Sequence, residues 1–269
     1  PDVLQGWRRW QAPIYYAVEW SLGHWFCAHV ITVSEDLRAR ALRLEHLPEK
    51  KVTAIYSGID LRPFEESVDR DTVRQAFGVG NDAPVVCTVG RLCEQKGVPD
   101  FLAAASQVHA ERPEVRFLVV GDGPLRGELE AQAERLGLAG CVIFAGQRSD
   151  VPALLAASDL FVTATLWEGM GKVIVEAMAA CRPLVSTNVG PIPEVVGDYP
   201  GALLVPPHNP EALAGAMLRV LGDLPTYQQW AADGRQRAQA RFSYETMCRA
   251  TDALYRRLLA ERACCGGAA

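Results

Sequence analysis

The chain has 269 residues, of which 49% are hydrophobic and 22% are charged, and its formal net charge is −5 at pH 7. These values are ordinary for a globular protein and exclude a chain that is disordered by default. The negative charge argues against a broad binding surface for nucleic acid, so no nucleic acid is expected among the partners.

Residues 1–60 predict part of a domain. An apolar run over 13–33 is interrupted by Glu19 and His24, so it falls short of the roughly 18 to 20 residues that cross a membrane. Residues 6–20 mix Trp and Tyr with Arg. This composition suits either a helix in peripheral contact with the inner face of a membrane or a helix packed on a sheet.

Two strand patterns, at 28–34 and 51–58, enclose a helical pattern at 35–44. The polar residues 61–83 then predict a linker. Eight cysteines fall at irregular spacings without a C-x-x-C pair. We therefore expect reduced thiols and a cytoplasmic protein.

Residues 84–225 predict a doubly wound α/β domain. Apolar, β-branched runs alternate with helical patterns, which indicates a parallel sheet covered by helices on both faces. The expected strands are 84–90, 115–121, 141–146, 159–164, 183–187 and 201–206, and the expected helices are 99–110, 124–136, 151–157, 172–180 and 210–221. Residues 226–262 predict further helices, the last capped by Ser243, and 263–269 form a tail.

Open parallel sheets bind ligands at the carboxyl ends of their strands, so the loops that follow the strands are the candidate sites. The loop 90–97 carries Arg91, and Lys96 stands directly before the next helix. A cation at the positively charged start of a helix is unfavourable unless an anion joins it. The loop therefore predicts an anion site, with a solvated basic loop as the alternative.

The loop after the second strand, VVGDGPLRG, resembles the dinucleotide-binding fingerprint. Gly121 and Gly123 are present, but Arg126 stands where the third glycine belongs, and the next strand ends without a ribose-binding acid. Nicotinamide binding is therefore not expected, and a tight turn that needs glycine is favoured.

The loop after the fourth strand reads WEGMGKVIVEA. Gly169 and Gly171 allow close approach to the backbone, and a helix beginning at Lys172 directs free amides into the crevice. An ion pair between Lys172 and Glu176 is the alternative, although this order of charges is the weaker one on a helix. Glu168 and Glu176 need partners if buried, and ligand hydroxyls would serve. Together the loops predict a site for a phosphorylated sugar or a nucleotide sugar.

Three segments of the sequence, taken in order, resemble the C-terminal donor-binding domain of the GT-B retaining glycosyltransferases of family 4. They are GRLCEQKG, VVGDGP and FAGQRSDVPALLAASDLFVTATLWEGMGKVIVEAMAACRPLVSTNVGPIPEVV. Glu168 and Glu176, with seven residues between them, match the E-x7-E motif of that family. The resemblance covers residues 28–260 in outline. It implies a GT-B fold in which 84–225 form the nucleotide-sugar domain, 1–60 are the remnant of an N-terminal Rossmann-like domain, and the last helices return to that domain.

The resemblance implies a hexosyltransferase of polysaccharide or glycolipid synthesis that uses a UDP- or GDP-sugar and retains the anomeric configuration. It assigns Arg91 and Lys96 to the donor diphosphate and Glu168 to the sugar hydroxyls, as catalytic residues. The other donor-binding residues that it implies, or that we infer from position, are Gly90, Gly146, Gln147, Arg148, Gly169, Met170, Gly171, Lys172, Val173 and Glu176. Within this set, Glu176 matches the acid that holds the ribose, and 146–148 match the contact to the base.

The expected chemistry needs neither a metal nor a cofactor. In metal-dependent glycosyltransferases a D-x-D motif holds a cation, and the D-x-D of this chain, residues 69–71, suits a solvated helix start better. Arg91, Lys96 and a helix dipole are expected to stabilise the leaving diphosphate instead.

Departures from the family pattern keep two alternatives open: a nucleotide-sugar 2-epimerase of the same fold, and a noncatalytic binding or scaffold protein. Ser57 replaces the Asn of NGxD, Pro191 replaces a glycine of GGxPE, and Cys181 with Arg182 replaces the usual glycine after the motif helix. Cys181 is expected to carry a conformational penalty if its φ is positive. Because residues 1–60 are too few for a complete domain, we expect this chain alone to bind a nucleotide but to transfer sugar weakly to an unknown acceptor, or not at all.

Overall fold

The computed structural model describes residues 12–266. Within them the backbone divides into two compact units, a larger one over residues 59–240 and a smaller one formed by residues up to 58 together with those from 241 onward. This division differs from the expected boundaries, because it assigns the segment 61–83 and the residues up to 240 to the larger unit.

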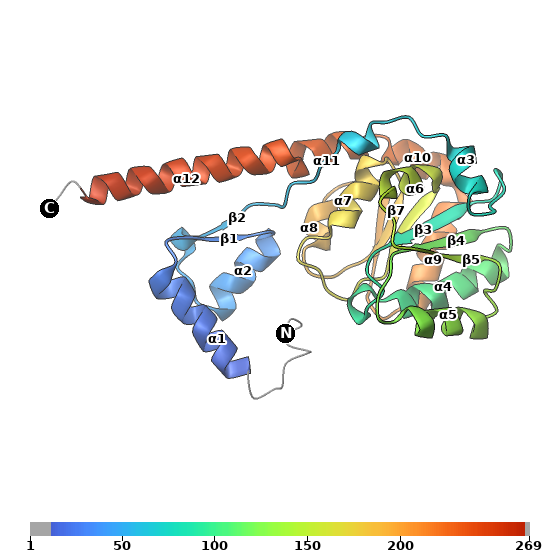
Figure 1. Ribbon diagram of the computed structural model, residues 1–269, viewed down its shortest axis with the longest axis horizontal. Coiled ribbons are helices and arrows are strands. Elements are labelled where there is room, and N and C mark those ends of the chain that lie inside the picture. Colours follow the sequence, from blue (N-terminus) through green and yellow to red (C-terminus); the bar gives the residue numbers. More distant parts are fainter. Residues whose placement is uncertain (1–11, 267–269) are drawn as a thin grey trace. The chain divides into compact units, whose positions relative to one another are not determined.

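The larger unit contains a six-stranded sheet in which all neighbouring strands run parallel (Figure 1). Its strands are β3 (Val85–Val89), β4 (Arg116–Val120), β5 (Val142–Gly146), β6 (Leu160–Thr163), β7 (Leu184–Thr187) and β8 (Ala202–Val205). Their order is β5-β4-β3-β6-β7-β8, so the direction of strand addition reverses between β3 and β6. Such a reversal opens a crevice at the carboxyl ends of the two central strands.

Helices cover both faces of this sheet (Figure 1). One face carries α4 (Val98–Glu111), α5 (Arg126–Arg135) and α9 (Pro210–Gly222), and the other carries α3 (Arg70–Gln75), α6 (Val151–Ala157) and α7 (Lys172–Ala179). The remaining elements are η3 (Arg62–Phe64), η4 (Glu94–Lys96), α8 (Ile192–Val196), α10 (Leu224–Ala231) and α11 (Gly234–Phe242). Central strands β6 and β7 are buried along their whole length, which explains their continuous apolar sequence.

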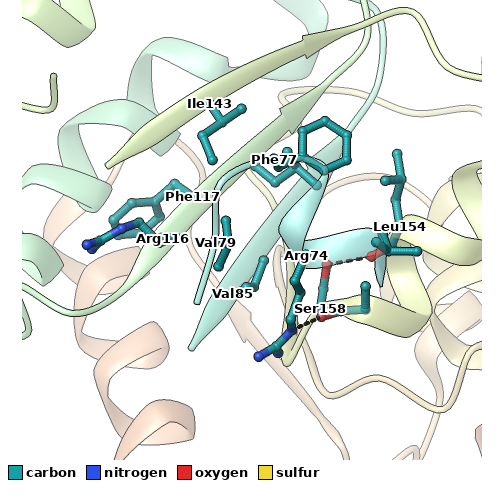
Figure 2. Close-up of a pocket in the computed structure, with 12 residues that line it drawn as sticks. Arg74, Phe77, Val79, Val85, Arg116, Phe117, Ile143, Leu154 and Ser158 are labelled. Carbon is teal, nitrogen blue, oxygen red and sulfur yellow. Dashed lines mark hydrogen bonds between the residues drawn. The ribbon is translucent and has the colours of Figure 1, made fainter. Parts of the chain in front are cut away.

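The segment 61–83, expected to be a linker, is folded onto the larger unit. Asp69 caps α3 by accepting from the amides of Asp71 and Thr72, so the D-x-D sequence is a helix start, as expected. Residues after α3, such as Phe77 and Val79, help to line a cavity together with residues at the amino ends of β3 and β4 (Figure 2). The volume of this cavity is about 20 Å³. Ligand sites usually occupy about 300 to 1,000 Å³, so this cavity is too small for a nucleotide.

The smaller unit contains a βαβ arrangement. Strands β1 (Val30–Thr32) and β2 (Val52–Ala54) pair in parallel and are joined through α2 (Glu35–Leu44), and the unit also holds α1 (Ala12–Ser21), η1 (Leu22–Phe26), η2 (Glu49–Lys51) and α12 (Tyr244–Gly266). Ser34 caps α2 by accepting from the amide of Leu37 at 3.2 Å. Both strands and α2 lie where the sequence predicts them. The expected interfacial helix 6–20 lies partly outside the described residues, as does the end of the expected tail.

Helix α12 begins as the sequence predicts, with the Ser243 hydroxyl accepting from the amide of Thr246 at 3.2 Å. Near its start, the Phe242 ring packs edge-on against Tyr56 with 5.2 Å between ring centroids. The amide of Gly58 also donates to Sδ of Met247 at 3.1 Å. The start of α12 and Phe242 shortly before it therefore contact the segment that follows β2.

Two further properties concern the described residues as a whole. None of their helices is both long enough and apolar enough to cross a membrane. The six cysteines among them whose side chains are described are free thiols.

Candidate functional site

The loops after β3, β4 and β6 are in close backbone contact at the carboxyl edge of the sheet. Gly121 has a φ of 134°, and a Cβ on it would lie 1.9 Å from the carbonyl oxygen of Gly90. Likewise, Gly97 has a φ of 58°, and a Cβ there would lie 2.0 Å from the carbonyl oxygen of Ala164. Only glycine fits at either position, so these residues allow the three loops to meet.

Lys96 and Glu168, which are 72 positions apart in the sequence, form an ion pair. Their side chains are only 19% and 11% exposed, so the pair is largely shielded from solvent. The anion that joins Lys96 at the start of α4 is therefore a residue of the chain itself, so the alternative of a solvated basic loop does not hold at Lys96. An ammonium group has three donors, so Lys96 can hold Glu168 and still donate to a phosphate oxygen.

Two other predicted cations are free to meet an anion. Arg91 and Lys172 are exposed, and neither side chain has an ion-pair or hydrogen-bond partner among residues 12–266. Helix α7 begins after Gly171, which has a φ of 77° and provides no side-chain cap. The amide of Ile174 donates to the carbonyl of Gly171 at 2.9 Å, so the amides of Lys172 and Val173 are the ones in the first turn of α7 that are available for an anion.

Glu176 lies half-buried in the middle of α7 and, within the described part of the chain, its carboxylate has no hydrogen-bond or ion-pair partner. The alternative of an ion pair with Lys172 is therefore wrong for this structure. Burial raises the pKa of Glu176 above its ordinary value, and the charge of Lys172 opposes part of this rise. A shielded carboxylate without a partner is costly, which makes it a candidate to accept from ligand hydroxyls.

A cleft of about 390 Å³ opens at the ends of β3, β4 and β5, within the usual size range of ligand sites. It is lined by Val89, Gly90, Arg91, Val120, Gly121, Asp122, Gln147, Arg148 and Val151. Four residues predicted from the sequence, Gly90, Arg91, Gln147 and Arg148, therefore share one cleft. Asp122 was missed, because its position in a tight turn carries no signal of a ligand.

The guanidinium of Arg148 is already engaged within the protein. It donates to both carboxylate oxygens of Asp150, at 2.8 and 2.7 Å, and lies 5.7 Å from the centre of the Phe77 ring. Gly146 has a φ of 70°, and its carbonyl accepts from the amide of Gly121 at 2.8 Å. The segment 146–148 therefore offers a ligand its backbone more readily than its side chains.

The remaining predicted residues lie on the loop before α7. Met170 is 4% exposed, so its side chain belongs to the core and only its backbone can serve a ligand, beside Gly169 and Val173. Behind this loop, Gln95 and Thr165 make hydrogen bonds that the sequence did not reveal, because nothing in a lone Gln or Thr indicates which loop it will contact. In the described part of the chain, no three His, Cys, Asp or Glu side chains are grouped to hold a metal ion.

Two of the departures from the family pattern have clear local consequences. Cys181 has a φ of 54°, as expected for a residue that replaces a helix-terminal glycine. Pro191 takes a φ of −81° as the residue before α8, which suits proline, and the preceding Gly190 has a φ of 49°. The loop before α8 therefore accommodates its proline without strain.

Comparisons with known proteins find similarity over most of the chain. The lipopolysaccharide core biosynthesis mannosyltransferase LpsB of Rhizobium meliloti is 31% identical over 77% of this chain and 61% of its own length. The alpha-maltose-1-phosphate synthase of Mycolicibacterium smegmatis is 31% identical over 86% of this chain and 63% of its own length. Among solved structures, that of Anabaena Alr3699/HepE in complex with UDP and glucose has a TM-score of 0.82 at 29% identity, covering 90% of this chain and 67% of that one.

These similarities extend over most of this chain but over a smaller share of its relatives, since the chain spans only 61% and 63% of the two proteins compared by sequence. The solved neighbours are GT-B glycosyltransferases, and the six-stranded parallel sheet agrees with that fold. The family model described as glycosyl transferases group 1 matches residues 69–237, more than half of the chain. The chain therefore belongs to the glycosyl transferases group 1 family, with its sheet crevice as the candidate site.

Proposed function

We propose that this chain supplies the donor site of a hexosyltransferase that takes a sugar from a nucleoside-diphosphate sugar and retains its anomeric configuration. One observation carries the proposal. Three charged residues follow the neighbouring central strands β3 and β6, the exposed Arg91 and Lys172 and the half-buried Glu176, and none has an ion-pair or hydrogen-bond partner in the described part of the chain. Lys172 also begins a helix that has no side-chain cap. The UDP and glucose named for the Anabaena relative support a donor of this class.

Arg91, Lys172 and the first-turn amides of α7 would bind the diphosphate. Departure of a nucleoside diphosphate builds negative charge on the β-phosphate, and each preorganised donor aimed at that charge contributes about 10² to 10³ in rate. In this proposal these groups replace the divalent cation that other glycosyltransferases use. An oxygen of the leaving phosphate assists removal of the acceptor proton on the face where the new bond forms.

Lys96 and Glu168 would act together at the transferred sugar. Glu168 accepts from sugar hydroxyls, while Lys96 bridges this carboxylate and the β-phosphate through separate N–H donors. Glu176 accepts from the ribose hydroxyls, and the backbone of 146–148 contacts the base. A uracil or a guanine is compatible with these roles.

The test is a screen of UDP-, GDP- and ADP-sugars for hydrolysis and transfer, with and without a chelator, and with NMR detection of the product anomer. Lys96→Ala and Glu176→Ala should weaken nucleotide binding by about tenfold or more, as expected for charge-assisted hydrogen bonds. Removal of the exposed charges in Lys50→Ala and Glu128→Ala provides matched controls that should bind as the wild type does. A folded wild-type protein that binds no nucleoside diphosphate would contradict the proposal.

A further inference from the structure

A second layer of polar contacts lies behind Lys96 and Glu168 and joins the loops that carry them. Nε2 of Gln95 donates to the carbonyl of Trp167 at 2.8 Å, and the amide of Leu166 donates to the carbonyl of Gln95 at 2.8 Å. The residue directly before Lys96 is therefore bonded to both residues directly before Glu168. These two hydrogen bonds fix the position of one loop relative to the other.

Thr165 adds further polar contacts between the same two loops. Its side chain is fully buried, and its hydroxyl lies 3.0 Å from the carbonyl oxygen of Gln95 and 3.2 Å from both the carbonyl oxygen of Trp167 and Oε1 of Glu168. A hydroxyl has one proton, so it donates to one of these acceptors at a time. The carbonyl of Thr165 accepts from the hydroxyl of Thr187 at the end of β7.

The backbone leaves no room for the two loops to slide. Directly after Lys96, Gly97 packs so closely under the carbonyl of Ala164 that no Cβ would fit between them. The loop after β6 is thus held on one side by Gln95 and Gly97 and on the other by Thr187.

We propose that Gln95 and Thr165 are positioning residues that hold Lys96 and Glu168 in the geometry needed for sugar transfer. This inference rests on the function proposed above. A displacement of about 1 Å at reacting groups can cost about 10²-fold in rate, so the register between the two loops matters for turnover. Neither residue lies on the elements expected to bind the base and the ribose, which are the segment 146–148 and α7.

The inference predicts a loss of turnover that is larger than the loss of nucleotide affinity. Gln95→Met removes the amide at similar length, and Thr165→Val removes the hydroxyl at similar shape. In the full-length protein each should lower kcat for sugar transfer by about 10- to 100-fold. The Kd for the free nucleoside diphosphate should rise by less than the roughly tenfold expected for Lys96→Ala, because the lysine and its charge remain. Thr165→Ser, which keeps the hydroxyl, should recover most of the wild-type kcat.

Thr163→Val is the matched control, because Thr163 is a buried threonine at the end of β6, two residues before Thr165. It makes no hydrogen bond to Lys96, Gln95 or Glu168 among the described contacts. Its kcat should equal that of the wild type, and thermal unfolding of each variant checks that it is folded. Wild-type kcat in both Gln95→Met and Thr165→Val would overturn the inference, and so would an equal loss of nucleotide affinity.

A second measurement does not depend on turnover. Crystal structures of the Gln95→Met and Thr165→Val variants should show the contact between Lys96 Nζ and the Glu168 carboxylate lost or lengthened, with the sheet unchanged. An unchanged contact in both variants would overturn the inference. A wild-type protein that turns over no nucleoside-diphosphate sugar would instead refute the proposed function, and the structures would still decide whether Gln95 and Thr165 position the pair.

Discussion

Arg74 of α3 donates to the carboxylate of Asp159 at 2.6 Å, and the two side chains are 7% and 10% exposed. The same guanidinium donates to the carbonyl of Ala157 at 2.9 Å, and the carboxylate accepts from the amide of Val85 at 2.8 Å. This pair therefore fastens α3 to α6 and to the first strand of the large sheet. It explains why a polar segment that reads as a linker is part of a folded unit.

Arg74→Ala should destabilise the larger unit by about 3 to 5 kcal/mol, because it leaves a shielded carboxylate without its main partner. Urea denaturation followed by circular dichroism measures this loss. Arg70 also pairs with Asp159, at 2.7 Å, but its side chain is 38% exposed, so Arg70→Ala is the control and should cost about 1 kcal/mol or less. Similar losses in the two variants would show that burial of the ion pair is not what fastens α3.

The sequence predicted the large sheet and its helices well, because continuous apolar strands that alternate with helices are compatible with few arrangements other than a parallel sheet covered by helices. It failed for α3, whose one buried polar residue, Arg74, is explained only by Asp159, a partner 85 positions away. Its prediction for Lys96 was incomplete for the same reason. A lysine at a helix start indicates an anion, but only the order of the strands shows that Glu168 provides it.

Cys181→Gly should stabilise the protein. Cys181 has a φ of 54°, and a residue with a side chain in this left-handed region costs about 1 to 2 kcal/mol more than glycine. We expect a net gain of about 1 kcal/mol, seen as a higher midpoint of thermal unfolding. Ala180→Gly, one residue earlier at a φ of −75°, is the control and should lower the midpoint. A gain in both variants would mean that backbone strain at Cys181 is not the cause.

Arg91→Gln and Lys172→Gln should each weaken binding of UDP or GDP by about tenfold, because each removes an unpaired cation at the crevice. The affinity for the nucleoside without phosphates should not change, since neither cation is expected to meet the base or the ribose. Added salt should weaken wild-type binding more than variant binding, because it screens exposed charges. Calorimetry measures all three effects, and an equal loss for nucleoside and diphosphate would place these side chains elsewhere on the ligand.

Glu176 should make both stability and nucleotide affinity depend on pH. Burial raises the pKa of this carboxyl in the folded protein, so between its ordinary pKa and the raised one the folded state holds a proton that the unfolded state has released. The stability that depends on Glu176 is therefore fully present below the ordinary pKa and is lost as the pH rises through the raised pKa. Nucleotide affinity should change in the opposite sense, because the ionised carboxylate is the better acceptor for ribose hydroxyls.

Glu176→Gln removes the titrating group at nearly the same shape, so it should abolish both pH-dependent components. The measurements are denaturant unfolding and nucleotide titration over the range from the ordinary carboxyl pKa to neutral pH. Glu128→Gln, on the exposed side of α5, is the control and should reproduce the wild-type profiles. If the Glu176→Gln profiles run parallel to those of the wild type, another group titrates in this range. The ribose contact assigned to Glu176 would then lose its support.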